Sequence, residues 1–252
     1  GQDRLKRAHV ILMQHPETAL YSGIMMMGES TVIEDCPTAY TDGLNKRYGR
    51  AFVEKQTDAE LRGLVMHENL HVALKHMSRF KVQFKKEPQL VNACADYVVN
   101  DIIDSFVDKK HCQLPEGVLL DKKYHNWSVN EVLRDLQKQQ ENGNPPPQSL
   151  DEHDFSGSGS EGGQSQPMTG VEQKAQDKKV DEALREGGLM ASRFGSGKTP
   201  RAIGESLAPK VDWKTVLKDF VTSVTKGVDE YTWRKFNKRY LADDIYLPST
   251  EN

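Results

Sequence analysis

Between Asp58 and Met77 the apolar residues are spread over nearly every face of a helix. A helix on a protein surface keeps its apolar residues on one stripe, so this pattern predicts a helix buried in a core. The start of the helix is marked by a capping box, in which Thr57 is followed three residues later by Glu60. The apolar positions are Leu61, Leu64, Val65, Met66, Leu70, Val72, Ala73, Leu74 and Met77.

A second apolar helix is predicted from Pro88 to about Val107, and it carries one polar stripe. Asn92, Asp96 and Asn100 recur at intervals of four, so they share one face of this helix. The residues around them are almost all apolar. A polar stripe on an otherwise apolar helix must face another polar group, because burying it against hydrocarbon alone is unfavourable.

The rest of the pattern predicts a small mixed sheet and further helices. Thr18–Met27 and Ser30–Tyr40 have strand-like composition, and Gly28-Glu29-Ser30 forms a turn between them. We expect this sheet to pack beside the buried helix. The fold class is therefore α+β, with a mostly helical remainder. The additional helices are expected over Leu5–His15, about Val171–Arg193 and Asp212–Thr225.

The length of 252 residues fits a single domain over residues 1–252 that contains one large insertion at 142–170. The insertion opens with Asn-Gly-Asn-Pro-Pro-Pro and continues into a run rich in glycine and serine from Ser156 to Gly163. A segment of this composition cannot bury a core, so it is predicted to be a flexible loop.

Composition and charge exclude several classes of protein. Hydrophobic residues make up 37% of the chain and charged residues 28%, which fits a soluble protein with a modest core. The formal net charge of −3 gives no general attraction to nucleic acid. No apolar run approaches the length of a membrane span. The three cysteines are scattered, which indicates a reducing compartment, so we expect a cytoplasmic location.

The run His67-Glu68-Asn69-Leu70-His71 lies inside the first buried helix and carries the candidate chemistry. Residues four apart differ by only about 40° around a helix axis, so His67 and His71 can share one metal ion. Glu68 lies about 100° from His67, which places it beside the metal as a general base for a metal-bound water. The alternative is that both histidines are satisfied core residues beside a surface glutamate.

Asp96 is the best candidate for a third protein ligand, because it lies in the middle of the polar stripe on the second helix. Asn92 and Asn100 would then orient the ligands through hydrogen bonds. The alternative is that Asp96 itself only orients one of the histidines. His76 is about 160° around the helix from the midpoint of the two imidazoles, so we expect it to face away, at the helix end or the surface.

The chain resembles a family of predicted metal-dependent peptidases of bacteria and phages. The resemblance is carried by HENLHVALKHMSR and NACADYVVNDI, and it extends from about Ala8 to Pro248. Longer members of that family continue into a von Willebrand factor A-like domain, whereas this sequence ends at Asn252. Further matching segments are LPEGVLLDKKY, WSVNEVLRDL, VDWKTVLKDFV, WRKFNKRY and DIYLP.

The resemblance implies a zincin-like fold with one Zn²⁺ ion. In such folds an edge strand lies above the metal and pairs with an extended substrate, and Thr38–Gly43 is our expectation for that strand. The family also implies a von Willebrand factor A-like domain or an AAA ATPase as a partner. The implied site residues are His67 and His71 as ligands, Glu68 as catalytic base and Asp96 as third ligand.

The sequence therefore predicts a zinc-dependent peptidase that acts on protein or peptide substrates. His153, in the insertion, can stabilise an oxyanion, but the alternative of a solvated acidic tract that contains a histidine is favoured. Tyr231 and Tyr240 are alternatives for that role, and the sequence does not choose. The alternative function is a non-catalytic binding or regulatory module stabilised by a structural metal. Structural zinc sites usually contain several cysteines, so the scattered cysteines and the presence of Glu68 favour catalysis.

Overall fold

The computed structural model describes residues 1–145, 147–149, 169–195, 203–204, 217–218, 221, 230–236 and 248–251. The chain divides into two compact units, Gly1–Leu207 and Ala208–Asn252. In the second unit, strands β4 (Glu230–Phe236) and β5 (Pro248–Glu251) pair antiparallel. The expectation of a single domain over residues 1–252 stays a prediction.

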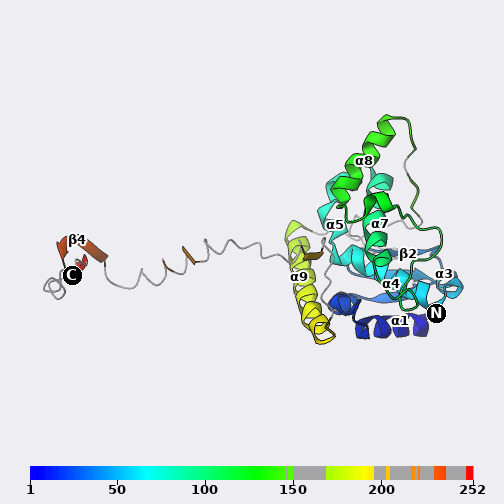
Figure 1. Ribbon diagram of the computed structural model, residues 1–252, viewed down its shortest axis with the longest axis horizontal. Helices are drawn as coiled ribbons and strands as arrows, with labels where there is room; N and C mark the ends of the chain where they lie inside the picture. Colours follow the sequence, from blue (N-terminus) through cyan, green and yellow to red (C-terminus); the bar gives the residue numbers. More distant parts are fainter. Residues whose placement is uncertain are drawn as a thin grey trace. The chain divides into compact units, whose positions relative to one another are not determined.

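The first unit is mostly helical and contains one small sheet, which fits the expected α+β class (Figure 1). None of the described helices combines the length and the apolar character needed to cross a membrane. The helices are α1 (Gln2–Gln14), η1 (Ala19–Tyr21), α2 (Ser22–Met25), α3 (Arg50–Lys55), α4 (Asp58–Ala73), α5 (His76–Arg79), α6 (Lys81–Lys86), α7 (Pro88–Asp104), η2 (Lys122–Tyr124), α8 (Val129–Glu141) and α9 (Gly170–Arg193).

The sheet of the first unit consists of β1 (Ser30–Ile33), β2 (Ala39–Thr41) and β3 (Lys46–Gly49) in the order β1–β3–β2. Strand β1 runs parallel to β3, and β2 runs antiparallel to it, so the sheet is mixed. Strand β2 is at one edge and contacts α4. It lies within Thr38–Gly43, the segment expected to form the edge strand.

The prediction of a strand over Thr18–Met27 is wrong, because this segment forms η1 and α2. Its apolar residues do not alternate between a buried and an exposed face. Leu20 and Ile24 are both buried and lie four residues apart, which is the spacing of one helix face. The segment packs against α1 and α9, so it is covered on two sides.

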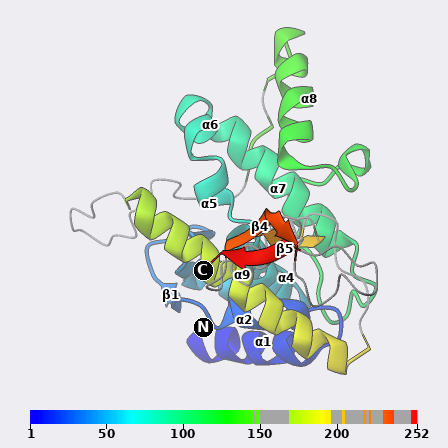
Figure 2. The same cartoon turned by 90° about the vertical axis from the view of Figure 1, so that its left-hand side faces the viewer.

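The buried helix predicted after Thr57 is α4, and the capping box between Thr57 and Glu60 is present in full. Helix α4 lies between α1 and α7 (Figures 1 and 2). It also contacts β2, α2 and α9, so almost every residue from Leu61 to Ala73 is buried. This enclosure explains why its apolar residues occupy every face of the helix.

Helix α9 confirms the helix predicted over Val171–Arg193 and crosses α2 and α4 (Figure 2). The helices expected over Leu5–His15 and from Pro88 are also confirmed, as α1 and α7. The helix expected over Asp212–Thr225 lies outside the described residues except at 217, 218 and 221. Within the insertion, residues 146 and 150–168 lie outside them as well.

Candidate metal centre

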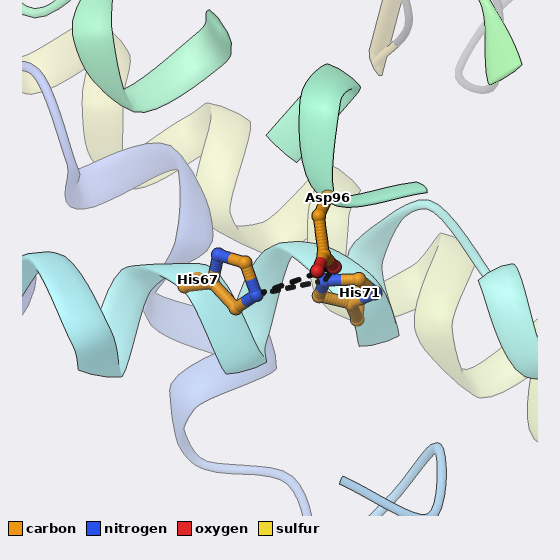
Figure 3. Close-up of side chains that lie close together, drawn as sticks. All are labelled: His67, His71 and Asp96. Carbon is orange, nitrogen blue, oxygen red and sulfur yellow. Dashed lines mark hydrogen bonds and ion pairs between the residues drawn. The ribbon is translucent and has the colours of Figure 1, made fainter. Parts of the chain in front are cut away.

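Two helices bring three potential metal ligands together in the core (Figure 3). Helix α4 supplies His67 and His71 from successive turns, and α7 supplies Asp96 from above. The Nε2 atoms of the two imidazoles are 3.1 Å apart. The Oδ1 atom of Asp96 is 3.6 Å from the first Nε2 and 3.3 Å from the second. All three residues are buried, at 4%, 0% and 3% relative exposure.

These three distances match the spacing that a tetrahedral metal ion requires. An ion bound at about 2.0–2.1 Å from each ligand atom separates neighbouring ligand atoms by about 3.3–3.4 Å. The observed separations of 3.1, 3.3 and 3.6 Å lie around that value. The spacing of the three donor atoms is therefore compatible with three corners of a tetrahedron around one ion.

The hydrogen bond on the far side of the His67 ring sets its tautomer. The Nδ1 atom of His67 lies 2.9 Å from Oδ1 of Asn100. The amide nitrogen of Asn100 donates to the Leu119 carbonyl at 2.9 Å, so the amide oxygen must face the ring. An oxygen accepts a proton, so Nδ1 of His67 carries the hydrogen. Its Nε2 atom then keeps a lone pair directed at Asp96 and His71.

The expectation that His76 faces away from the site is wrong. His76 is buried, at 2% relative exposure, and its Nδ1 atom lies 3.1 Å from Nδ1 of His71. The expectation assumed one continuous helix, whereas α4 ends at Ala73 and Lys75 has a positive φ of 57°. This turn starts the new helix α5 at His76 and directs its side chain back toward the site.

Further polar groups surround the Asp96 side of the site. The Ser149 hydroxyl donates a hydrogen bond to Oδ2 of Asp96, so the chain just before the central part of the insertion reaches the site. Asn92 is buried one turn before Asp96 on α7, and its orienting role stays a prediction.

Three residues were candidates for stabilising an oxyanion. Tyr231 lies in β4 of the second unit, and His153 and Tyr240 lie outside the described residues.

Glu68 is fully buried, at 0% relative exposure, and its charge acts on two residues of the central strand β3. Burial lowers the pKa of Lys46 to about 8, against the opposing charges of Asp42 and Glu68. Burial and the Glu68 charge raise the pKa of Tyr48 well above its usual value. The Lys46 ammonium donates to two backbone carbonyls near the end of α2, at 3.2 and 2.6 Å.

Sequence reasoning missed this contribution of β3. Lys46 and Tyr48 are two residues apart, so a strand places both on one face, and that spacing was the available signal. The strand itself was not predicted, because Lys46–Gly49 is short and has no apolar alternation. The sequence therefore predicted Glu68 beside the metal, but it did not predict that the Glu68 carboxylate interacts with Lys46 and Tyr48.

A small pocket lies beside His71 and is closed by α9. Its walls come from the end of α4, from α5, from Gly43 after strand β2 and from α9. The Gln176 side chain of α9 donates to the Gly43 carbonyl at 2.7 Å. The Ser78 hydroxyl of α5 donates to Asp177 of α9 at 2.8 Å. Helix α9 therefore holds the end of the edge strand and the start of α5 next to the site.

The arrangement defines a mostly helical α+β protein with a buried His-His-Asp group that could hold a metal ion. Among the residues that the structure describes, this is the group of three or more such side chains whose ligand atoms converge closely enough to hold an ion.

The comparison with known families agrees with this class. A family described as a putative metallopeptidase domain matches residues 2–251, and the chain belongs to this family. The resemblance noted from the sequence is thereby confirmed, while a following von Willebrand factor A-like domain stays a prediction. Neither a curated protein nor a solved structure matches the chain.

Proposed function

We propose that the chain is a zinc-dependent peptidase with a zincin-like site, in which one Zn²⁺ ion is held by His67, His71 and Asp96. The observation that carries this proposal is the convergence of three buried donor atoms at tetrahedral spacing. The membership of the family described as a putative metallopeptidase domain supports the same reaction class.

The proposed chemistry is hydrolysis of a peptide bond by an activated water. Zinc at this position would supply Lewis acidity, which lowers the pKa of a water and polarises the scissile carbonyl. Glu68 accepts the proton of the attacking water and passes it to the leaving amine. Asn100 and His76 lie at the Nδ1 atoms of His67 and His71, so the Nε2 atoms of both rings face the proposed ion.

The proposed substrate position follows from the edge of the sheet. Strand β2 has one paired side, toward β3, and its other side is an edge. An extended peptide can add to such an edge through main-chain hydrogen bonds, which give affinity with little sequence preference. We therefore propose protein or peptide substrates that bind along β2. Stabilisation of the oxyanion by His153, Tyr231 or Tyr240 stays open among the three.

A second candidate function is favoured by the burial of the site. Glu68 and His71 each have 0% relative exposure, which is what a closed structural metal site shows. On this reading the metal holds α4 and α7 together, and the chain is a non-catalytic binding or regulatory module. The two functions share the metal site and differ only in whether Glu68 acts on a substrate.

Metal analysis combined with cleavage of a broad peptide library separates these functions. We expect the wild-type protein to hold one zinc ion per chain and to cleave peptides. The Glu68→Gln variant keeps the metal and loses cleavage, because the amide cannot accept the proton of the water. Glu54→Gln, an exposed change on α3, is the control and keeps both properties.

Two results would redirect the proposal. A zinc-loaded wild type that cleaves nothing supports the module instead. Full cleavage by Glu68→Gln removes the general-base assignment. Anomalous scattering at the zinc absorption edge identifies the ion directly.

The proposal has two further parts. The family resemblance suggests a von Willebrand factor A-like domain or an AAA ATPase as partner, and the cysteine pattern suggests a cytoplasmic location.

A further inference from the structure

We propose that His76 is a positioning residue that fixes the His71 imidazole in the tautomer and orientation needed to bind the metal. This inference rests on the metal site of the proposed function and not on its peptidase activity. It adds to the site a residue that does not bind the metal itself but contacts one of the ligands. The helical spacing in the sequence places this residue on the face opposite the two ligand histidines.

The contact between the two rings is buried and well defined. Their Nδ1 atoms are 3.1 Å apart, and their planes cross at 80° with ring centroids separated by 4.9 Å. One Nδ1 must therefore donate a proton to the other. The opposite nitrogen of His71, Nε2, lies 3.3 Å from the Asp96 carboxylate. For Nε2 to offer a lone pair to an ion, Nδ1 of His71 has to be the donor and His76 the acceptor.

The same arrangement holds the other imidazole. Nδ1 of His67 has an acceptor in the Asn100 amide oxygen at 2.9 Å, as Nδ1 of His71 has one in His76. On each ring, Nδ1 thus faces a hydrogen-bond acceptor, and Nε2 is left to offer its lone pair to the ion. Because Asn100 and His76 contact the same atom of the two rings, we assign both the same role, which is to orient the two Nε2 atoms toward a single ion.

The backbone turn at Lys75, between α4 and α5, brings His76 next to His71. In a continuous helix, residues five apart lie about 140° from one another, so His76 could not reach His71. Lys75 interrupts the helix with φ 57° and ψ 38°, a left-handed conformation that is unfavourable by about 1–2 kcal/mol for a residue with a Cβ atom. The Lys75 side chain is anchored on α9, because its ammonium forms a partly buried ion pair with Asp181.

His76 is itself held on its other side. Its ring packs against Phe80, one turn further along, with the centroids 5.9 Å apart. Residues that fix the orientation of a metal-binding histidine typically change metal affinity by about 10–100-fold when they are removed. We therefore expect the zinc affinity of the site to depend on the acceptor that His76 provides.

The test compares two variants of nearly equal shape, His76→Asn and His76→Leu. The Asn side chain places an oxygen close to the former Nδ1 position and can accept the His71 proton, whereas Leu cannot. We expect His76→Leu to weaken zinc binding by about 10–100-fold and His76→Asn to keep most of the affinity. Affinity is measured by competition with a chromophoric chelator, and circular dichroism of each metal-free variant verifies the fold.

A second readout does not require metal. Nitrogen NMR of the histidine side chains in the metal-free protein reports which ring nitrogen carries the proton. We expect the share of His71 protonated at Nδ1 to be larger in the wild type and in His76→Asn than in His76→Leu, because without the acceptor at residue 76 the Asp96 carboxylate, 3.3 Å from Nε2, favours the other tautomer.

The outcomes separate this inference from the proposed function. Equal zinc affinity of folded His76→Leu and wild type overturns the positioning role, and so does an equal loss in both variants. A wild type that binds zinc but cleaves nothing removes the peptidase and leaves the positioning role supported by the affinities. If the wild type binds no zinc, the proposed metal site fails, and an unchanged His71 tautomer in His76→Leu then overturns the positioning role independently.

Discussion

At the scale of single side chains, Asp96 is the group that converts two neighbouring imidazoles into a three-atom site. The Nε2 atoms of the two imidazoles lie 3.1 Å apart, which is close enough for both to contact one ion. The carboxylate adds a third donor atom and a negative charge in a buried position. Both features favour a divalent cation, because a buried charge needs a compensating partner.

We predict that Asp96→Asn weakens zinc binding by more than about 100-fold, beyond what the loss of an orienting residue typically does. The amide keeps the shape of the side chain and removes its charge. Asp104→Asn is the matched control, since Asp104 is on the same helix and half-exposed, with Lys109 as its partner. Its zinc affinity, measured by chelator competition, should equal that of the wild type. Equal affinities of the two variants would exclude Asp96 as a ligand.

The sequence anticipated part of this site, and the reason is periodicity. His67 and His71 had to share a helix face, and the polar stripe that contains Asp96 and Asn100 had to face a polar group. The structure brings these four residues together. His76 was misplaced because nothing in the local pattern shows that Lys75 leaves the helical region. The Lys75 side chain is anchored by Asp181, more than 100 residues further along the chain.

At the scale of elements, the placement of α9 depends on two very close backbone contacts. A Cβ atom added to Gly187 would lie 1.9 Å from the Leu20 carbonyl oxygen. A Cβ atom on Gly23 of α2 would lie 2.3 Å from the Ala183 carbonyl oxygen. The helix thus packs directly on the backbone of η1 and α2, which positions Asp181 for its ion pair with Lys75.

The adjacent glycines of α9 provide a direct test of this packing. We predict that Gly187→Ala destabilises the protein by about 1–3 kcal/mol, because the new methyl group overlaps a backbone oxygen that cannot rotate away. Gly188→Ala should stabilise it by about 0.5–1 kcal/mol, since alanine favours a helix and its Cβ would meet only a Leu20 methyl group at 3.9 Å. Urea unfolding measures both. Equal effects of the two changes would contradict the docking of α9.

The end of α1 and the segment after α7 meet through a pair of histidines. The rings of His15 and His111 stack with centroids 3.6 Å apart and planes at 12°. Burial, together with the neighbouring charges of His15 and Arg62, lowers the pKa of His111 from 6.5 to about 4, against the opposing effect of Asp108 and Glu17. The folded state therefore resists protonation of this ring.

We predict that the protein loses stability as the pH falls from about 6.5 to about 4. In this window the unfolded chain binds a proton at His111 and the folded chain does not, so lowering the pH favours unfolding. The slope from one group is at most about 1.4 kcal/mol per pH unit. His111→Asn should show a smaller loss over the same window, measured by urea unfolding at each pH. If the free energy of unfolding fell equally with pH in the variant and in the wild type, His111 would make no contribution to the pH dependence.

The elements illustrate what local sequence can and cannot predict. The capping box and apolar residues of α4, the apolar residues of α7 and the charged helical sequence of α9 were sufficient to place these helices, because each signal lies within the helix's own segment. The segment Thr18–Met27 was assigned to a strand because its apolar residues are continuous, and continuous burial does not distinguish a strand from a short helix. The pairing of β3 with both β1 and β2 depends on contacts across the chain, which no local pattern records.

At the scale of the whole molecule, the His-His-Asp group lies between the two helices around which the first unit is built. Helix α4 contacts most other elements of the unit, and α7 connects it to α6, η2 and α8. The ligand atoms converge only when these helices are packed, so the unfolded chain has no preformed site. Binding free energy at such a site therefore adds to the free energy of unfolding.

We predict that zinc raises the unfolding temperature of the first unit. At a free zinc concentration about 1,000 times Kd, binding adds about 4 kcal/mol to the free energy of unfolding. For a unit of this size each kcal/mol corresponds to about 2–4 °C, so the expected shift is on the order of 10 °C. Circular dichroism at helical wavelengths, with zinc or with a chelator, measures it. Asp96→Asn should show at most about a third of this shift, because a site weakened 100-fold adds only about 1.4 kcal/mol at the same zinc concentration. Asp104→Asn should keep the full shift. If zinc raised the melting temperature of Asp96→Asn as much as that of the wild type, the stabilising ion would lie elsewhere, and the buried triad would have to be explained without a metal.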